Sequence, residues 1–148
     1  MTTPRRTFTG LVIACLFLFG CAAMFVAPYD EKTDGVLTEL IVLTQTTVTT
    51  ADSGQLSAEE RQQFYNKAIG MVRTMKNRSA LYSKNQQEID ALAELERRYQ
   101  DLRQHGASPR TSLTTGLRAT LLDLQQIQVA KKRSAAFSAG LKKNQPTQ

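Results

Sequence analysis

The chain has 148 residues, a formal net charge of +6 at pH 7 and 41% hydrophobic residues, which suits one small domain and leaves no room for two. Its only cysteines, Cys15 and Cys21, lie in an apolar N-terminal stretch. This excludes a disulfide framework, or a thiol-based metal or redox site, from the remaining chain. Sparse aromatic residues, no tryptophan and few prolines after residue 28 favour helices over sheet.

The chain opens with a targeting sequence, in which two arginines precede a long uncharged apolar run. Within it, "LFGC" at residues 18–21 resembles the lipobox of bacterial lipoproteins, where a small residue before the cysteine lets the signal peptidase approach the backbone. We therefore expect a signal peptide over residues 1–20 and lipid attachment to Cys21. A lipid-proximal tether would then cover residues 21–29.

Other interpretations of the N-terminus stay open. "VIAC", which ends at Cys15, is a better literal lipobox, but it leaves an apolar region of only about seven residues, the short limit for a signal. Residues 11–27 are 17 apolar residues, the lower limit for an uncleaved membrane span. Ordinary secretion with cleavage near Ala23 is a third interpretation. All of them place residues from Tyr29 onward outside the cytoplasm, because the arginines hold the N-terminus inside.

Lipid attached to Cys21 would anchor the chain firmly. Acyl chains such as palmitate contribute about 0.8 kcal/mol per buried methylene, so several chains hold a protein stably on a bilayer. Enterobacterial lipoproteins that stay at the inner membrane have Asp directly after the cysteine, whereas this chain has Ala22. Its resemblance to the lipoproteins without this Asp implies the outer membrane, facing the periplasm, rather than the inner membrane.

Apolar residues at helical spacing predict four helices. The first begins after Asp30, a helix cap, and ends near Thr50 in a weakly helical threonine-rich stretch, for which a strand is the alternative. The second begins at Ser57, which can form a capping box with Glu60, and runs to about Tyr82.

The third helix begins after Asn85, because Asn85 and Glu88 repeat the capping pattern. It ends at His105, and Gly106 follows as a left-handed closing residue. The apolar residues of this helix define the face that it buries: Ile89, Leu92, Leu95, Tyr99 and Leu102.

The fourth helix begins at Ser108 and Pro109, an N-cap followed by a first-turn proline, and continues to Lys131 or beyond. Its buried face should carry Leu113, Leu117, Leu121, Leu124 and Ile127. Four such helices with short loops bury their apolar faces best as an antiparallel all-α bundle. We expect this bundle over residues 30–139, with a disordered tail over residues 140–148.

Candidate catalytic or metal-binding groups are scarce. His105 is the only histidine, and it is expected near solvent at a helix end, where the helix dipole favours it. No second histidine or later cysteine completes a zinc site. The carboxylate pairs Glu59/Glu60 and Asp90/Glu94 are expected on caps or solvent-facing sides. We therefore expect no catalytic residue, no metal, no cofactor and no enzymatic activity.

Positive charge gathers at the C-terminal end, since no acidic residue follows Asp123. Lys131, Lys132 and Arg133 are candidate contacts for an anion or a partner. Outside the cytoplasm such anions are phospholipid head groups, lipopolysaccharide phosphates or cell-wall polymers, so nucleic acid is not expected as a partner. The alternative is a solvated helix end that complements its own dipole.

Several segments carry a resemblance to a known group of proteins. "YDEKTDGVLTEL" after the lipobox, "FYNKA", "MVRTMKNRSALYSKN", "ALAELERRYQDLRQHG" and "VAKKR" resemble a group of uncharacterised lipoproteins of diderm bacteria. The resemblance runs from about Cys21 to Arg133. It implies a lipid-anchored helical protein and carries no activity with it.

The expected function is therefore a lipid-anchored periplasmic protein with a structural or protein-interaction role in the cell envelope. Its contacts would be the membrane, through the anchor, and an envelope protein whose identity the sequence does not give. Phe64 and Tyr65 are candidate contacts, although core packing is the favoured interpretation. The alternative is a binding module for anionic envelope polymers or head groups, which requires the basic end to form one patch with Arg73, Lys76 and Arg78.

Overall fold

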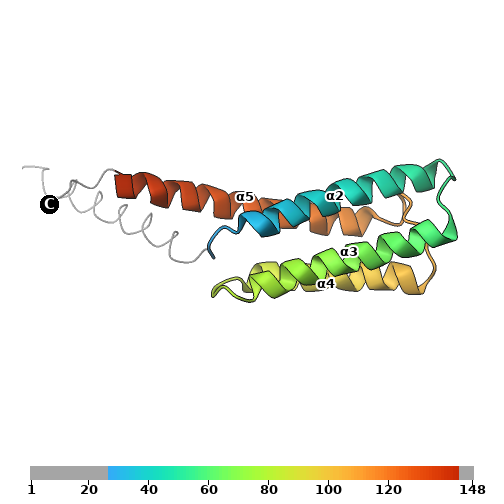
Figure 1. The fold of residues 1–148 in the computed structure, drawn as a ribbon, viewed down its shortest axis with the longest axis horizontal. Helices are drawn as coiled ribbons and strands as arrows, with labels where there is room; N and C mark the ends of the chain where they lie inside the picture. Colours follow the sequence, from blue (N-terminus) through green and yellow to red (C-terminus); the bar gives the residue numbers. More distant parts are fainter. Residues whose placement is uncertain (1–26, 144–148) are drawn as a thin grey trace, which may run out of the picture.

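The computed structural model describes residues 27–143 (Figure 1). Over these residues the chain forms helices joined by loops, without strands. Each helix packs against the next, and the last returns to the first, which confirms the expected antiparallel all-α bundle. The helices are α2 (Glu31–Asp52), α3 (Ala58–Ser79), α4 (Gln86–Gln104) and α5 (Thr115–Lys143). The predicted signal peptide, the lipidation site Cys21 and the last five residues lie outside the described part.

Side-chain caps begin the first two helices as expected. Asp30 accepts a hydrogen bond from the backbone N–H of Lys32 at 3.2 Å, and so it caps α2. Ser57 Oγ accepts from the backbone N–H of Glu60 at 3.2 Å, and the Glu60 carboxylate accepts from the Ser57 N–H at 2.9 Å. This reciprocal capping box satisfies two amides that lack a partner within the helix.

The threonine-rich stretch is helical to Asp52, and the strand alternative is wrong. The hydroxyls of Thr44 and Thr47 donate to the carbonyls of Leu40 and Leu43, each at 2.8 Å. These bonds satisfy the buried hydroxyl groups within the helix itself, so threonine can occupy its buried face.

Two glycines close helices in the left-handed conformation. Gly54 after α2 has φ +75°, and Gly106 after α4 has φ +60°. At α4 the N–H of Ala107 donates to the carbonyl of Leu102 at 3.0 Å, and the N–H of Gly106 donates to Arg103 at 3.1 Å. This pair of bonds is a Schellman motif, and it confirms the predicted end of the helix.

The ends of α3 and α5 differ from the sequence prediction. α3 ends at Ser79 rather than near Tyr82, because residues 80–85 turn away from the helix axis. α5 begins at Thr115, not at Ser108, because residues 108–114 form tight turns instead of a first helical turn. As a result Leu113, which was expected in the core, is half exposed.

Pro109 does not begin a helix, because its ring is buried in the loop between α4 and α5. At the other end, α5 continues to Lys143, beyond the expected start of a disordered tail at residue 140. The last third of α5 passes the end of the bundle and projects from it, as the red helix in Figure 1 shows.

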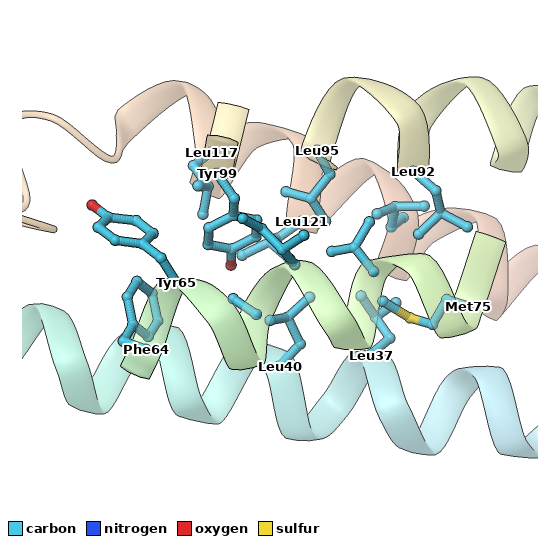
Figure 2. Packing of buried hydrophobic residues seen from close by; sticks show 14 residues of the cluster. Leu37, Leu40, Phe64, Tyr65, Met75, Leu92, Leu95, Tyr99, Leu117 and Leu121 are labelled. Atoms are coloured by element: carbon cyan, nitrogen blue, oxygen red, sulfur yellow. The ribbon is translucent and has the colours of Figure 1, made fainter. Parts of the chain in front are cut away.

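The core is a single cluster to which all four helices contribute (Figure 2). Phe64 and Tyr65 belong to it, which confirms core packing for both. The ring of Phe64 meets that of Tyr99 edge-on, with centroids 6.0 Å apart. The Tyr99 hydroxyl lies 2.7 Å from the Thr44 hydroxyl, so the buried polar tip of this tyrosine has a partner. The remaining cluster residues are Leu37, Leu40, Ala68, Ile69, Val72, Met75, Leu92, Leu95, Leu117, Leu121 and Leu124.

The two ends of the bundle differ. At one end the chain arrives at Ala27, residues 80–85 join α3 to α4, and α5 projects; we call this the proximal end. The distal end carries the loops at residues 53–57 and 105–114. The proximal end is the one at which the chain arrives from the predicted lipidation site.

Candidate functional site

A buried polar cluster lies at the proximal end and joins three segments. Its members are Ser79 at the end of α3, Asn85 before α4, Glu88 in the first turn of α4 and Lys131 in α5. Glu88 is 1% exposed and Lys131 is 5% exposed. Charges this far from water are costly unless they are paired and hydrogen-bonded.

Every member of the cluster has a partner within it. The Lys131 ammonium group pairs with the Glu88 carboxylate and donates to the Asn85 side-chain oxygen at 2.5 Å. The Ser79 hydroxyl donates to the second oxygen of Glu88 at 2.5 Å. The Asn85 amide donates to the backbone carbonyl of Ser79 at 3.0 Å. Such a closed set of bonds fixes the position of α5 against the start of α4.

Two sequence interpretations are wrong here. Asn85 and Glu88 do not form a capping pair, because Asn85 makes no side-chain bond to the start of α4 and both side chains serve the cluster. Lys131 is not a surface contact for an anion or a partner, because it is buried and neutralised by Glu88. Lys132 and Arg133, the other two candidates, are exposed.

A second ion pair joins the start of α2 to the end of α3. The Arg78 guanidinium donates to both carboxylate oxygens of Asp30, at 2.9 and 2.8 Å. The Thr33 hydroxyl also donates to Asp30, at 2.7 Å. The hydrogen bond from Arg78 is the main cause that lowers the pKa of Asp30 to about 2. Asp30 therefore stays ionised at any physiological pH.

The residues just before α2 are seated on the bundle. Ala27 is 4% exposed and lines a groove of about 550 Å³ between the start of α4 and the middle of α5, beside Glu88 and Lys131. The Tyr29 hydroxyl donates to Asp34 at 2.7 Å, which raises the pKa of the phenol to about 12. The Lys132 ammonium lies 5.7 Å from the centre of the Tyr29 ring, a cation–π contact. The groove and the cation–π contact thus place the approaching chain against α5.

The larger basic patch required by the anion-binding alternative is not assembled. Arg73 and Lys76 both pair with Glu96, Arg73 at 2.7 Å. Arg78 is occupied by Asp30. Only Lys132 and Arg133 remain as exposed basic side chains at the start of the projecting part of α5.

The other titratable residues singled out in the sequence lie in local contacts. Glu60 caps α3, and Glu94 pairs with Arg97 on its own helix at 2.8 Å. His105 is exposed, with Nδ1 2.8 Å from the carbonyl oxygen of Asp101. Within residues 27–143 no three acidic, histidine or cysteine side chains are grouped as metal ligands.

A second groove, of about 300 Å³, runs between α2 and α5 on the flank of the bundle. Its walls mix aliphatic side chains with threonines from both helices and from the loop before α5, among them Ile41, Val48, Thr114 and Leu121. No charged cluster converges on it, since Arg118 alone of its lining residues is ionised.

Glu88 and Lys131 could have been found in the sequence. Glu88 precedes Leu92 and Leu95 at spacings of four and seven, so it continues the buried stripe of α4. Lys131 follows Leu124 at a spacing of seven and therefore continues the stripe of α5. Opposite charges within two apolar stripes are a signal for a buried pair.

No family model, no curated protein and no solved structure matches this chain. None of the helices in the described part is both long and apolar enough to cross a bilayer. Almost all of the alternative span, residues 11–27, lies outside that part. The resemblance to lipoproteins of diderm bacteria therefore stays a hypothesis.

Proposed function

We propose that this protein is a membrane-tethered, non-enzymatic helical bundle that acts as a structural or interaction component of the bacterial cell envelope, on the periplasmic side. The observation that carries the proposal is the seating of Ala27 and Tyr29 on the bundle, only a few residues after Cys21. A lipid on Cys21 would thus be joined to the folded domain by a very short link.

The short link distinguishes this arrangement from a domain on a long flexible tether. Because Ala27 is buried beside Glu88 and Lys131, only residues 22–26 separate Cys21 from the packed part of the chain, which keeps the bundle close to its anchor. A packed bundle held close to a bilayer suits a spacer or a docking platform. The paired polar groups of the buried cluster support the same role, since their bonds hold helices together.

Binding of anionic polymers through a broad basic patch is a weaker candidate. It depended on Arg73, Lys76 and Arg78, and carboxylates occupy all three. An outer-membrane location rests on Ala22, which stands where enterobacterial lipoproteins retained at the inner membrane have Asp.

Membrane retention tests the tether. Membranes from producing cells are washed with high salt, and the protein is then followed in the pellet and the supernatant. The wild type and Cys15→Ala should stay in the pellet, whereas Cys21→Ala should be released or accumulate as an unprocessed precursor. A full-length wild-type chain in the pellet would point instead to an uncleaved span, and release of the wild type would contradict the proposal.

A further inference from the structure

The proximal end exposes apolar side chains that the bundle does not use. Of the large hydrophobic residues in the described part, Leu81 at 77% and Phe137 at 57% are the most exposed. Leu81 lies in the loop between α3 and α4, and Phe137 lies on the projecting part of α5, residues 132–143. Both therefore lie at the end where the chain arrives from the predicted anchor (Figure 1).

The projecting part of α5 has a suitable length to reach the bilayer. Cys21 precedes the buried Ala27 by six residues, which span at most ~20 Å when fully extended. The projection starts at Lys132, beside Tyr29, and its eleven further residues extend it by roughly 17 Å as a helix. A membrane within reach of the link is thus also within reach of the projection. An uncleaved span would bring the bilayer closer still.

The composition of the projection matches an anionic surface. No acidic residue occurs after Asp123, while Lys132, Arg133, Lys142 and Lys143 all lie within residues 132–143. Each basic residue close to an anionic leaflet strengthens attachment about fivefold. An apolar ring such as that of Phe137 can enter the boundary between the head groups and the acyl chains of a bilayer.

We infer that residues 132–143 of α5, together with Leu81, rest on the anionic phospholipid head groups of the membrane that carries the anchor. The buried Lys131–Glu88 pair lies one residue before the projection and fixes its direction relative to the bundle. The protein would then contact the bilayer at two points, the lipid and α5, with its distal end away from the surface. This inference rests on the proposed tether.

The test uses the full acylated protein in vesicles of phosphatidylethanolamine and phosphatidylglycerol. Acylation leaves no free thiol after signal removal, so an environment-sensitive fluorophore can be placed at Ser138→Cys on the projection or at Ser112→Cys on the distal end. Both positions are exposed, and both changes replace a serine. A head-group nitroxide lipid should quench the label at residue 138 much more strongly than the label at residue 112.

A matched pair of charge variants isolates the electrostatic contribution. In the labelled protein, Arg133→Gln with Lys142→Gln should lower the equilibrium constant for membrane contact of the projection about 25-fold. Arg110→Gln with Arg118→Gln removes the same charge elsewhere and should leave the quenching unchanged. Phosphatidylcholine vesicles or high salt should weaken the quenching at residue 138 in the same way as Arg133→Gln with Lys142→Gln.

Intact mass and co-flotation with the vesicles, measured on the same samples, separate the two proposals. Loss of acylation and flotation would overturn the tether. Equal, weak quenching at residues 138 and 112 in an acylated, vesicle-bound protein would overturn the membrane contact alone. The projection would then be free for a protein or cell-wall partner.

Discussion

The Lys131 ammonium pairs with the Glu88 carboxylate inside the bundle, at the position where α5 passes beyond its neighbours. The pair joins the first turn of α4 to the last packed turn of α5. Asn85 and Ser79 complete its hydrogen bonds, so neither charge faces the interior alone. The exit of α5 from the bundle is therefore fixed by a specific contact as well as by apolar packing.

Removing one charge of this pair should be costly. Lys131→Met leaves the Glu88 carboxylate buried without its cation, and we expect it to lower the free energy of unfolding by about 3–5 kcal/mol. Adding Glu88→Leu to this variant should recover a large part of the loss, because no uncompensated charge then remains. Urea unfolding followed by circular dichroism measures both changes.

The exposed pair Lys67–Glu39 is the matched control. Its side chains lie 3.1 Å apart and are 56% and 59% exposed. Lys67→Met should change stability by no more than about 1 kcal/mol. Similar losses for Lys67→Met and Lys131→Met would show that the buried cluster has no special role.

Asp30 should make stability depend on acid pH. Its pKa is lowered to about 2 in the folded protein, from 3.8. The carboxylate therefore contributes stability above about pH 4, and this contribution is lost as the pH falls towards 2. Asp30→Asn should cost roughly 1–2 kcal/mol at pH 7, and the difference from wild type should shrink towards pH 2. Urea unfolding of wild type and Asp30→Asn at several pH values measures this stability difference. A difference that does not change with pH would contradict the lowered pKa of Asp30.

Two glycine substitutions should change the stability of the fold in opposite directions. Gly106→Ala places a side chain at φ +60° and should cost about 1 kcal/mol. Gly70 lies inside α3 with nothing within 4 Å of an added Cβ, so Gly70→Ala should stabilise the fold by roughly 0.5–1 kcal/mol. Thermal unfolding compares the two, and an unchanged or higher melting temperature for Gly106→Ala would contradict the Schellman role of Gly106.

Tyr99→Phe removes a buried hydroxyl and leaves the Thr44 hydroxyl with only its bond to the Leu40 carbonyl. We expect a loss of about 1 kcal/mol in the free energy of unfolding. Combining it with Thr44→Val should cost less than the sum of the two single changes, since both lose the same bond. A double-mutant cycle measures this coupling, and strict additivity would exclude the bond.

The helical architecture could be predicted because its signals are local. The Ser57–Glu60 capping box, the Gly106 helix end and the spacing of Leu117, Leu121 and Leu124 each depend on a few neighbouring residues. The start of α5 was missed for the opposite reason. Ser108 and Pro109 have the right local pattern, but packing of the proline ring in the loop overrides it.

The candidate site could be predicted only in part. Lys132 and Arg133 are exposed as expected, while Lys131 is not, because burial depends on helix phase and on the distant Glu88. Likewise, local pattern assigned Asn85 and Glu88 to a cap. The pairing of Asp30 with Arg78 joins residues far apart in sequence, so only the packed bundle reveals it.

Intact mass of the protein extracted from membranes tests the central claim most directly. The tethered account predicts a chain that begins at residue 21 and carries acyl chains, with this form absent from Cys21→Ala and present in Cys15→Ala. A full-length unmodified mass, or a mature chain without lipid, would contradict it.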